Sequence, residues 1–394
     1  MKILHIIPTY LPADLVSGPI QVIHSLNQEL VNLGVEVTVY TSNSGGNKIL
    51  DVPTCKEILI DGVKVFYFPL TFKPWFYSIG LHRALKKNTK DFDLIHISGI
   101  FLSMLTLAAH YGKKFNIPYI ISPHGMLMKR PLLSKWLKKK LYLSIIEKKN
   151  IANAAGVHFT TELEKEEYLE VRFPATKAIV IPHGISLKEA IPHLDGNLFR
   201  KKFNIPKNKK IVFFMGRLNW IKGFDTLLPA FADVVKGDTE AVLLLSGPDG
   251  GYQQEIDSMV DILKIKDKVI HTGPLEGEEK VAALCESSVL VLTSYSENFS
   301  VVAAEAMSLG LPVVITRGVG IWSIVKDYGA GIVVEKEINE VSSALLKILN
   351  NPELAQEMGE KGKRLVSVEF NPSQVASKMK NVYEEVIKYS YNSK

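Results

Sequence analysis

Short apolar runs alternate with amphipathic stretches along the whole chain. In the first half the predicted strands are Lys2–Ile7, Glu36–Thr41, Lys64–Phe68, Leu94–Ile97, Tyr119–Ser122, Gly156–Thr160 and Ala178–Ile181. Between them, stretches such as Gln21–Leu33 and Leu102–Phe115 repeat apolar residues at helical spacing. This alternation predicts a mainly parallel, doubly wound α/β sheet.

The same pattern restarts at Lys210. The second set of predicted strands is Lys210–Met215, Ala241–Ser246, Val269–His271, Val289–Thr293, Pro312–Ile315 and Gly331–Val334. We therefore expect two Rossmann-like domains, residues 1–190 and 191–371, joined within the polar stretch Gly184–Lys209. A last helix, Gln374–Tyr389, follows them. Open α/β sheets bind ligands beyond the carboxyl ends of their strands, so two such domains facing each other predict a ligand cleft.

Composition narrows the class of protein without identifying it. Of the 394 residues, 46% are hydrophobic and 22% charged, which is ordinary for a globular protein. No apolar run approaches the roughly 20 residues that a membrane span needs. Cys55 and Cys285 are far apart and lack metal-ligand spacing, so we expect free thiols and a cytoplasmic location.

The net charge of +6 is concentrated in residues 129–149, which hold eight basic side chains and Glu147. Eight positive charges minus one negative charge give this segment +7, which accounts for the whole net positive charge of the chain. Leu133, Leu137, Leu141 and Ile145 form one apolar row at i+4 spacing within the predicted helix Leu132–Lys149. The favoured interpretation is a helix packed on the sheet with solvated lysines. The alternative is peripheral contact with an anionic membrane, at the inner face of the plasma membrane. Nucleic-acid binding is disfavoured because the segment lacks a repeated interleaving of aromatic with basic residues.

Two glutamates lie eight residues apart after the predicted strand Val289–Thr293. Glu297 lies in the turn, and Glu305 lies about one turn into the following helical run Val301–Leu309. Free N–H groups at such a helix start bind phosphate and sugar groups, and carboxylates accept hydrogen bonds from hydroxyls. On spacing alone, the favoured interpretation is a loop carboxylate and a solvated helix residue.

A second motif, Gly216-Arg217-Leu218-Asn219-Trp220-Ile221-Lys222-Gly223, follows strand Lys210–Met215 and precedes a helix. Glycines let the backbone approach a ligand closely. Arg217 and Lys222 place two cations at a strand end, where they could neutralise a diphosphate. The context favours phosphate binding over two solvated loop cations.

Three further loops follow predicted strands. Gly247-Pro248 and Gly273-Pro274-Leu275 are turn-rich, and ordinary turn chemistry explains them as well as recognition of a nucleobase does. His124, in Ser122-Pro-His-Gly125, would face the cleft and could exchange a proton near neutral pH, although a lone histidine is more often structural. Gly18 precedes the helix Gln21–Leu33 and could contact phosphate, but no Gly-x-Gly-x-x-Gly fingerprint follows the first strand.

Metal sites are not indicated. Asp91-Phe92-Asp93 precedes a strand, at the wrong end for a ligand site, and no other carboxylate or His/Cys cluster suggests a metal.

Together these motifs resemble the retaining, sugar-nucleotide-dependent glycosyltransferases of family 4, which have the GT-B fold. The segments that match are Gly216-Arg-Leu218, Lys222-Gly223, Gly247-Pro248, Glu297 with Glu305-Ala-Met-Ser-Leu-Gly-Leu-Pro312, and Ser122-Pro-His-Gly125. The resemblance implies transfer of a hexose, with glucose and UDP as the leading expectation, to a saccharide or lipid-linked saccharide in cell-surface polysaccharide synthesis. It implies no metal and no cofactor besides the nucleotide sugar.

The resemblance also assigns roles to residues. Arg217 and Lys222 would bind the donor diphosphate, Glu305 the ribose hydroxyls and Glu297 the transferred sugar. His124 would contact that sugar near the reacting centre, and Gly18 would close over the diphosphate. The remaining donor-binding expectations are Gly216, Gly247, Pro274, Leu275, Asn298, Phe299, Ser300 and Val301. The segment 372–394 would cross back to the first domain.

The chain departs from the family pattern at three places. Ser17-Gly18-Pro19 stands where many relatives have two glycines, Asn298 where many have Gly, and His183 where Asn is common. We interpret His183 as a hinge-region residue. Alternatives left open are a sugar-nucleotide epimerase, a phosphorylase, and a catalytically silent nucleotide-sugar binding subunit.

Overall fold

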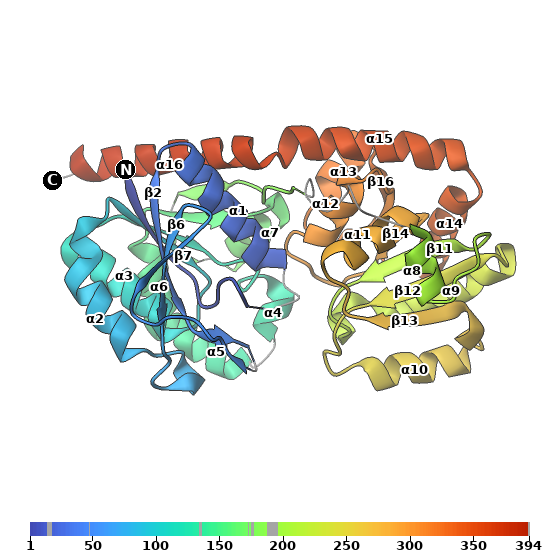
Figure 1. Ribbon diagram of the computed structural model, residues 1–394, viewed down its shortest axis with the longest axis horizontal. Coiled ribbons are helices and arrows are strands. Elements are labelled where there is room, and N and C mark those ends of the chain that lie inside the picture. Colours follow the sequence, from blue (N-terminus) through green and yellow to red (C-terminus); the bar gives the residue numbers. More distant parts are fainter. Residues whose placement is uncertain are drawn as a thin grey trace. The chain divides into compact units, whose positions relative to one another are not determined.

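The chain divides into two compact units, each with its own sheet. The computed structural model describes residues 1–13, 18–46, 48–133, 136–171, 173–174, 177–186 and 196–392. Unit 1 comprises Met1–Gly184 and Pro372–Lys394, and unit 2 comprises Ile185–Asn371 (Figure 1). Unit 1 is therefore discontinuous in sequence, and its last helix, α16 (Pro372–Asn392), comes from the C-terminal end of the chain.

Unit 1 is built on a sheet that, among the described residues, has the strand order β10-β9-β8-β7-β1-β2-β6-β5. All neighbours in it are parallel except β5 and β6. The strands of unit 1 are β1 (Lys2–Ile6), β2 (Glu36–Ser42), β3 (Ser44–Gly45), β4 (Lys48–Ile49), β5 (Glu57–Ile60), β6 (Val63–Phe68), β7 (Leu94–Ser98), β8 (Tyr119–Ser122), β9 (Gly156–Phe159) and β10 (Ala178–Val180). Its other helices are α1 (Gly18–Asn32), α2 (Ile79–Asn88), α3 (Ser103–Phe115), α4 (Lys129–Leu133), α5 (Trp136–Tyr142), α6 (Lys148–Ala152) and α7 (Glu162–Glu170).

Each face of this sheet has its own apolar core. On one face, side chains such as Ile23 of α1 and Met379 of α16 pack on Ile3 and Val39 of the strands. The other core contains residues of α2, α3, α6 and α7. Helices on both faces explain why the strands are apolar on both sides, as expected for a doubly wound parallel sheet.

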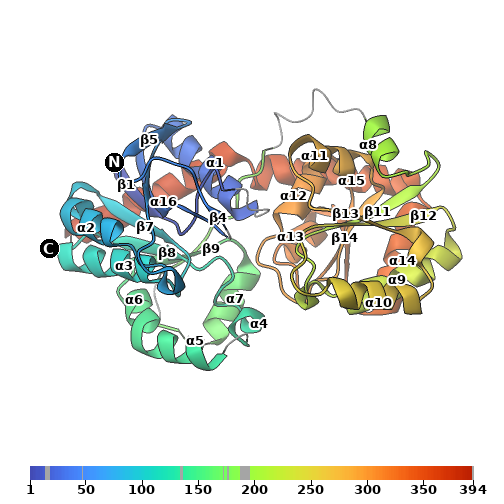
Figure 2. The same ribbon diagram turned by 60° about the horizontal axis from the view of Figure 1, so that its bottom comes forward.

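Unit 2 is a parallel six-stranded sheet, in its described part, with the order β13-β12-β11-β14-β15-β16 (Figure 2). Its strands are β11 (Lys210–Met215), β12 (Ala241–Ser246), β13 (Val269–Gly273), β14 (Val289–Leu292), β15 (Val313–Thr316) and β16 (Gly331–Val334). Its helices are α8 (Gly196–Lys202), α9 (Phe224–Gly237), α10 (Gln253–Ile262), α11 (Gly277–Glu286), α12 (Val301–Ser308), α13 (Trp322–Tyr328), α14 (Ile338–Leu349) and α15 (Pro352–Glu369). Numbered within the unit, the order is 3-2-1-4-5-6, the Rossmann arrangement. Its topological switch point lies between β11 and β14, where such sheets bind ligands.

The basic segment differs from its prediction. The expected continuous helix is broken into α4, α5, a π-helical turn (Leu143–Glu147) and α6. The interpretation that its apolar row packs on the sheet is wrong for the three members whose side chains are described. Leu133, Leu141 and Ile145 are 69%, 63% and 55% exposed. Within the described part of the chain, no helix has both the length and the apolar character that crossing a bilayer needs.

Candidate active site

The loops after β11 and β14 meet at the switch point of unit 2. Lys222, from the first loop, places its Nζ 2.8 Å from Oε2 of Glu297, from the second. Ser294 Oγ donates to the same carboxylate oxygen at 3.1 Å. The two side chains are only 14% and 16% exposed, so little water screens this ion pair. The structure thus brings together a cation and a carboxylate that lie 75 residues apart.

Glycines make this close approach possible. Gly247 has φ +143°, and a Cβ added to it would lie 1.9 Å from the carbonyl oxygen of Gly216. A Cβ on Gly223, at φ +75°, would lie 2.1 Å from the carbonyl oxygen of Thr293. Beside them, the Lys222 side chain passes over Gly216, where an added Cβ would be 3.4 Å from Cε. Side chains at these positions would push the loops apart and displace the Lys222 ammonium group.

The backbone of Glu297 is also fixed. Its N–H donates to the carbonyl of Gly318 at 2.8 Å, and its own carbonyl accepts from the N–H of Gly320 at 2.8 Å. Gly318 has no room for a side chain, since an added Cβ would lie 2.3 Å from the carbonyl oxygen of Ser294. The carboxylate is therefore held by the loops after two neighbouring strands, β14 and β15.

The N-terminus of α12 follows directly. Ser300 adopts a left-handed conformation, φ +71°, and its Oγ caps no backbone N–H. Among the described residues, the buried hydroxyls of Ser296 and Ser300 have no hydrogen-bond partner. Phe299 is buried and Val301 is half-buried. The first N–H groups of a helix lack intrahelical acceptors, so this end presents hydrogen-bond donors to an anionic group.

Glu305, in the second turn of α12, is not the solvated residue that its spacing favoured. It is buried, at 6% exposure, and its Oε1 accepts from Lys280 Nζ at 2.7 Å. The Lys280 side chain, on α11, is 14% exposed. Helix α12 thus carries a buried carboxylate, Glu305, that is paired with Lys280. This partner was not predicted from the sequence.

The other donor-binding predictions in unit 2 lie on the same edge of the sheet. Arg217 is exposed and makes no ion pair with a described residue. Pro274 is exposed and Leu275 buried, in the loop after β13. Gly247 and Asn298 lie after β12 and β14. The predicted residues of unit 2 therefore all follow the carboxyl ends of its strands.

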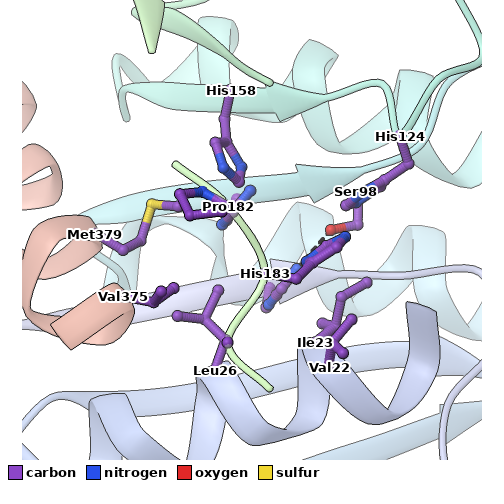
Figure 3. A pocket seen from close by; sticks show the side chains of 13 residues that line it. Val22, Ile23, Leu26, Ser98, His124, His158, Pro182, His183, Val375 and Met379 are labelled. Carbon is purple, nitrogen blue, oxygen red and sulfur yellow. Dashed lines mark hydrogen bonds between the residues drawn. The ribbon is translucent and has the colours of Figure 1, made fainter. Parts of the chain in front are cut away.

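In unit 1, His124 borders a small cavity, of about 10 Å³, near the carboxyl ends of the strands. Figure 3 shows His124, Ser98 and His158 around it. Both ring nitrogens of His124 are buried and have no hydrogen-bond partner among the described residues. The cavity is about the smallest that a water molecule can occupy. The ring of His183 stacks on that of His124, with centroids 5.9 Å apart. Gly18 opens α1, and Ser17 before it lies outside the described residues.

A chain of hydrogen bonds with one direction runs through this part of unit 1. His158 Nε2 lies 2.8 Å from the carbonyl of Ile181, which can only accept, so this nitrogen carries the proton. His158 Nδ1 must then accept from Ser122 Oγ (2.7 Å), and Ser122 Oγ accepts from His96 Nε2 (2.6 Å). His96 Nδ1 finally accepts from the hydroxyl of Tyr383 on α16, at 2.6 Å.

Burial keeps these imidazoles neutral. It lowers the pKa of His158 to about 4, despite the opposing hydrogen bond to Ile181. Burial, and then the neighbouring His183, lowers the pKa of His124 well below its usual value. The pKa of His183 falls to about 3, from burial and from His158. At neutral pH, His124 therefore offers a ligand one hydrogen-bond donor and one acceptor, and no positive charge.

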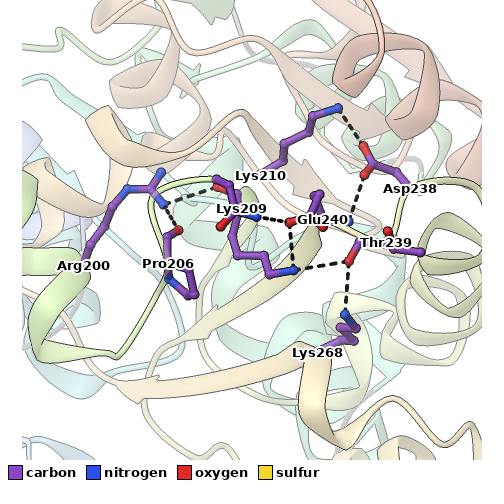
Figure 4. Close-up of polar contacts among 9 residues, drawn as sticks. Arg200, Pro206, Lys209, Lys210, Asp238, Thr239, Glu240 and Lys268 are labelled. Atoms are coloured by element: carbon purple, nitrogen blue, oxygen red, sulfur yellow. Dashed lines mark hydrogen bonds and ion pairs between the residues drawn. The ribbon is translucent and has the colours of Figure 1, made fainter.

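The amino ends of the unit 2 strands hold a different polar cluster, shown in Figure 4. Lys210 pairs with Asp238 at 2.8 Å, and Lys209 with Glu240 at 2.9 Å. Burial would raise the pKa of Asp238, but the hydrogen bonds from Lys210 and from the Glu240 backbone outweigh it and lower that pKa. These charges are paired with one another at the edge away from the switch point, so they tie the β11 and β12 ends together.

Comparison with known proteins identifies the family. The model named Glycosyltransferase Family 4 matches residues 16–189, and the model named Glycosyl transferases group 1 matches residues 195–365. The chain belongs to the family 4 glycosyltransferases. This family 4 enzyme is 24% identical over 382 residues to the N-acetyl-alpha-D-glucosaminyl L-malate synthase of Bacillus anthracis, a match that covers 94% of each chain.

Solved structures show that this glycosyltransferase has the GT-B fold. Sucrose-phosphate synthase from Thermosynechococcus elongatus is 25% identical, with a TM-score of 0.80 over 98% of this chain and 99% of its own. Anabaena HepE, crystallised with UDP and glucose, is 15% identical, with a TM-score of 0.77 over 98% of this chain and 100% of its own.

Sequence reasoning missed four residues of this glycosyltransferase that the structure places at or near the predicted site. Lys280 gave no local signal, because its partner Glu305 is 25 residues away. His5, His96 and His158 did give one, since each interrupts an apolar strand: Leu-His-Ile, Ile-His-Ile and Val-His-Phe. A polar residue inside a strand that is buried on both faces needs hydrogen-bond partners, and this rule could have located the histidine chain.

Proposed function

We propose that this glycosyltransferase moves glucose from UDP-glucose to a saccharide or lipid-linked saccharide acceptor in cell-surface polysaccharide synthesis, with retention of the anomeric configuration. The observation that supports it most is the Lys222–Glu297 pair at the switch point of unit 2. HepE, which has the same fold, was crystallised with UDP and glucose, and this supports the choice of donor.

The pair suits a nucleotide sugar because it offers both kinds of contact that the donor needs. Carboxylates accept hydrogen bonds from sugar hydroxyls, and ammonium groups neutralise phosphate. In the structure each charge is balanced by the other, which limits the cost of keeping both largely buried. When the donor binds, Lys222 can share its three N–H groups between Glu297 and the diphosphate.

The reaction breaks the bond between the sugar and the diphosphate, and negative charge grows on the leaving group. Lys222, Arg217 and the first N–H groups of α12 are proposed to stabilise that charge. Glu305, held by Lys280, is proposed to accept hydrogen bonds from the ribose hydroxyls. In unit 1, we propose that His124 makes a neutral hydrogen bond to the donor sugar and that Gly18 contacts the diphosphate.

Steady-state release of UDP, measured with and without candidate saccharide acceptors, tests the catalytic role of Lys222. Lys222→Ala should lower turnover by about 10²–10³-fold, because it removes a charge that acts on the leaving group. The matched control is Lys236→Ala, whose lysine is 77% exposed and pairs with Asp233 on the same helix. Circular dichroism should show both variants folded. Near-normal turnover in folded Lys222→Ala would reject the assignment.

A thermal-shift series tests the donor separately. Ligands that bind only the native state raise the melting temperature, so UDP-glucose should stabilise more than ADP-glucose, GDP-mannose or UDP-galactose. A larger shift with another nucleotide sugar would show that UDP-glucose is the wrong donor, and it would not contradict the proposed transfer reaction. Analysis of the product anomer by nuclear magnetic resonance tests retention.

A further inference from the structure

The segment from α4 to α6 presents apolar side chains to solvent among lysines. Leu141 and Ile145 lie four residues apart and therefore on one helical face, and both are exposed. Lys148 follows three residues after Ile145 and is also exposed, as is Lys149. Leu133 of α4, at 69% exposure, adds a third apolar side chain. We call Leu141, Ile145, Lys148 and Lys149 the basic apolar face.

The helix cannot easily rotate to bury this face, because its opposite side is anchored. Glu147 is buried, and its Oε1 accepts from the backbone N–H of Phe101 at 3.0 Å. Leu143 is buried in the core of unit 1, and the hydroxyls of Tyr142 and Thr106 lie 2.9 Å apart. Rotation would break these contacts and separate the buried Glu147 carboxylate from the Phe101 N–H. The exposure of Leu141 and Ile145 is therefore built into the fold.

The charge on this face is positive. Glu147, the acidic residue of the segment, points inward, as its hydrogen bonds show. Lys148 and Lys149 have no ion pair with any described residue. Nearby carboxylates engage the start of α4 instead: Lys129 pairs with Glu170, and its backbone N–H donates to Glu167. Uncompensated lysines thus lie next to exposed leucine and isoleucine side chains.

We propose that the basic apolar face docks the protein on an anionic lipid bilayer. Apolar side chains can enter the boundary between headgroups and acyl chains, while the flanking lysines contact anionic headgroups. A second copy of the chain is a poorer occupant, since pairing the face with itself would set lysines against lysines. In Figure 2 the segment runs along the periphery of unit 1. The proposal does not depend on the donor or on the transfer reaction.

Co-sedimentation of the full chain with vesicles tests the proposal. One set contains phosphatidylcholine alone and the other equal parts of phosphatidylcholine and phosphatidylglycerol, each at low and at high salt. Binding should require the anionic lipid and should weaken with salt. Leu141→Ser with Ile145→Ser should weaken it at least tenfold. Lys148→Gln with Lys149→Gln should weaken it roughly 25-fold, about fivefold for each cation removed.

The matched control is Leu198→Ser with Ile262→Ser, which removes apolar side chains that are 64% and 77% exposed on unit 2. It should bind vesicles like the parent protein. Absence of binding to anionic vesicles at low salt would overturn the proposal, as would equal losses in the control and in Leu141→Ser with Ile145→Ser. Light scattering without lipid tests the alternative that the face binds a second copy of the chain. If the parent protein is a dimer, and Leu141→Ser with Ile145→Ser dissociates it while vesicle binding is unchanged, the face serves self-association and the proposal is wrong.

Discussion

Replacing Lys280 by methionine should destabilise unit 2 by about 3 kcal/mol. The substitution keeps most of the side-chain volume and removes the charge that faces Glu305, whose side chain is only 8% exposed. Removing one partner of a buried ion pair typically costs about 3–5 kcal/mol, and the 14% exposure of Lys280 argues for the lower end. For a unit of 187 residues (371 − 185 + 1), about 3 kcal/mol lowers the melting temperature by roughly 6–12 °C.

The measurement must report on unit 2 alone, because a chain with two units need not unfold in one step. Of the four tryptophans, Trp220 and Trp322 belong to unit 2. Replacing Trp75 and Trp136 by phenylalanine leaves fluorescence that follows unit 2. Urea titrations of Lys280→Met, Glu305→Gln and the double variant, all in that background, then form a double-mutant cycle.

The double variant should recover about 2 kcal/mol of the loss, since the neutral amide that replaces the Glu305 carboxylate no longer needs a cation. The control is Lys266→Met, whose lysine pairs with Asp261 at 3.2 Å with both side chains largely exposed. It should change stability by less than about 0.5 kcal/mol. If Lys280→Met lowers the free energy of unfolding by no more than Lys266→Met does, the ion pair between Lys280 and Glu305 does not stabilise unit 2, and the reasoning is wrong.

Three further predictions concern other parts of the molecule. Gly247→Ala should lower the free energy of unfolding by at least about 2 kcal/mol in thermal denaturation, because its Cβ would meet the Gly216 carbonyl. Gly251→Ala, where an added Cβ has no atom within 4 Å, should lower it by about 1 kcal/mol. Equal losses in the two variants would refute the steric argument. His158, with a pKa of about 4 when folded against 6.5 unfolded, should contribute stability that is full above pH 6.5 and falls by about 3 kcal/mol as the pH drops to 4. The His158→Gln variant, followed by urea titration of unit 1, should lose this dependence. Glu305→Ala should abolish any preference for UDP over 2′-deoxy-UDP in calorimetric titrations, and a retained preference would move ribose recognition elsewhere.

Most of the fold was predictable because each domain repeats one simple pattern. Apolar runs such as Lys210–Met215 and Ala241–Ser246 match the observed strands residue for residue. The antiparallel strand β5 escaped prediction, since Glu57–Ile60 is short and lies at the sheet edge with alternating exposure. The basic helix was misjudged because periodicity shows that an apolar row exists and not which way it faces. Its direction is set by Glu147 and Phe101, which lie 46 residues apart.

The candidate site was predictable in its loops and less so in its contacts. Residues that follow strands, such as Lys222 and Glu297, could be placed at one sheet edge from topology alone. That they form an ion pair depends on loop geometry set by Gly216, Gly223 and Gly247, which no local pattern encodes. The environment of His124 depends likewise on His183, from a separate part of the chain, and the sequence indicated only that both follow strands.

The hydrogen bond between His96 and Tyr383 joins residues 287 positions apart, and it bears on how the chain is made. One core of unit 1 includes Val375, Met379, Tyr383 and Val386 of α16. A ribosome that adds about 5–20 residues per second takes roughly 10–40 s to synthesise the intervening unit 2. During that time one face of the unit 1 sheet lacks its α16 cover, while unit 2, continuous in sequence, can fold. Nascent unit 1 is therefore the part of this protein most exposed to aggregation and to capture by chaperones.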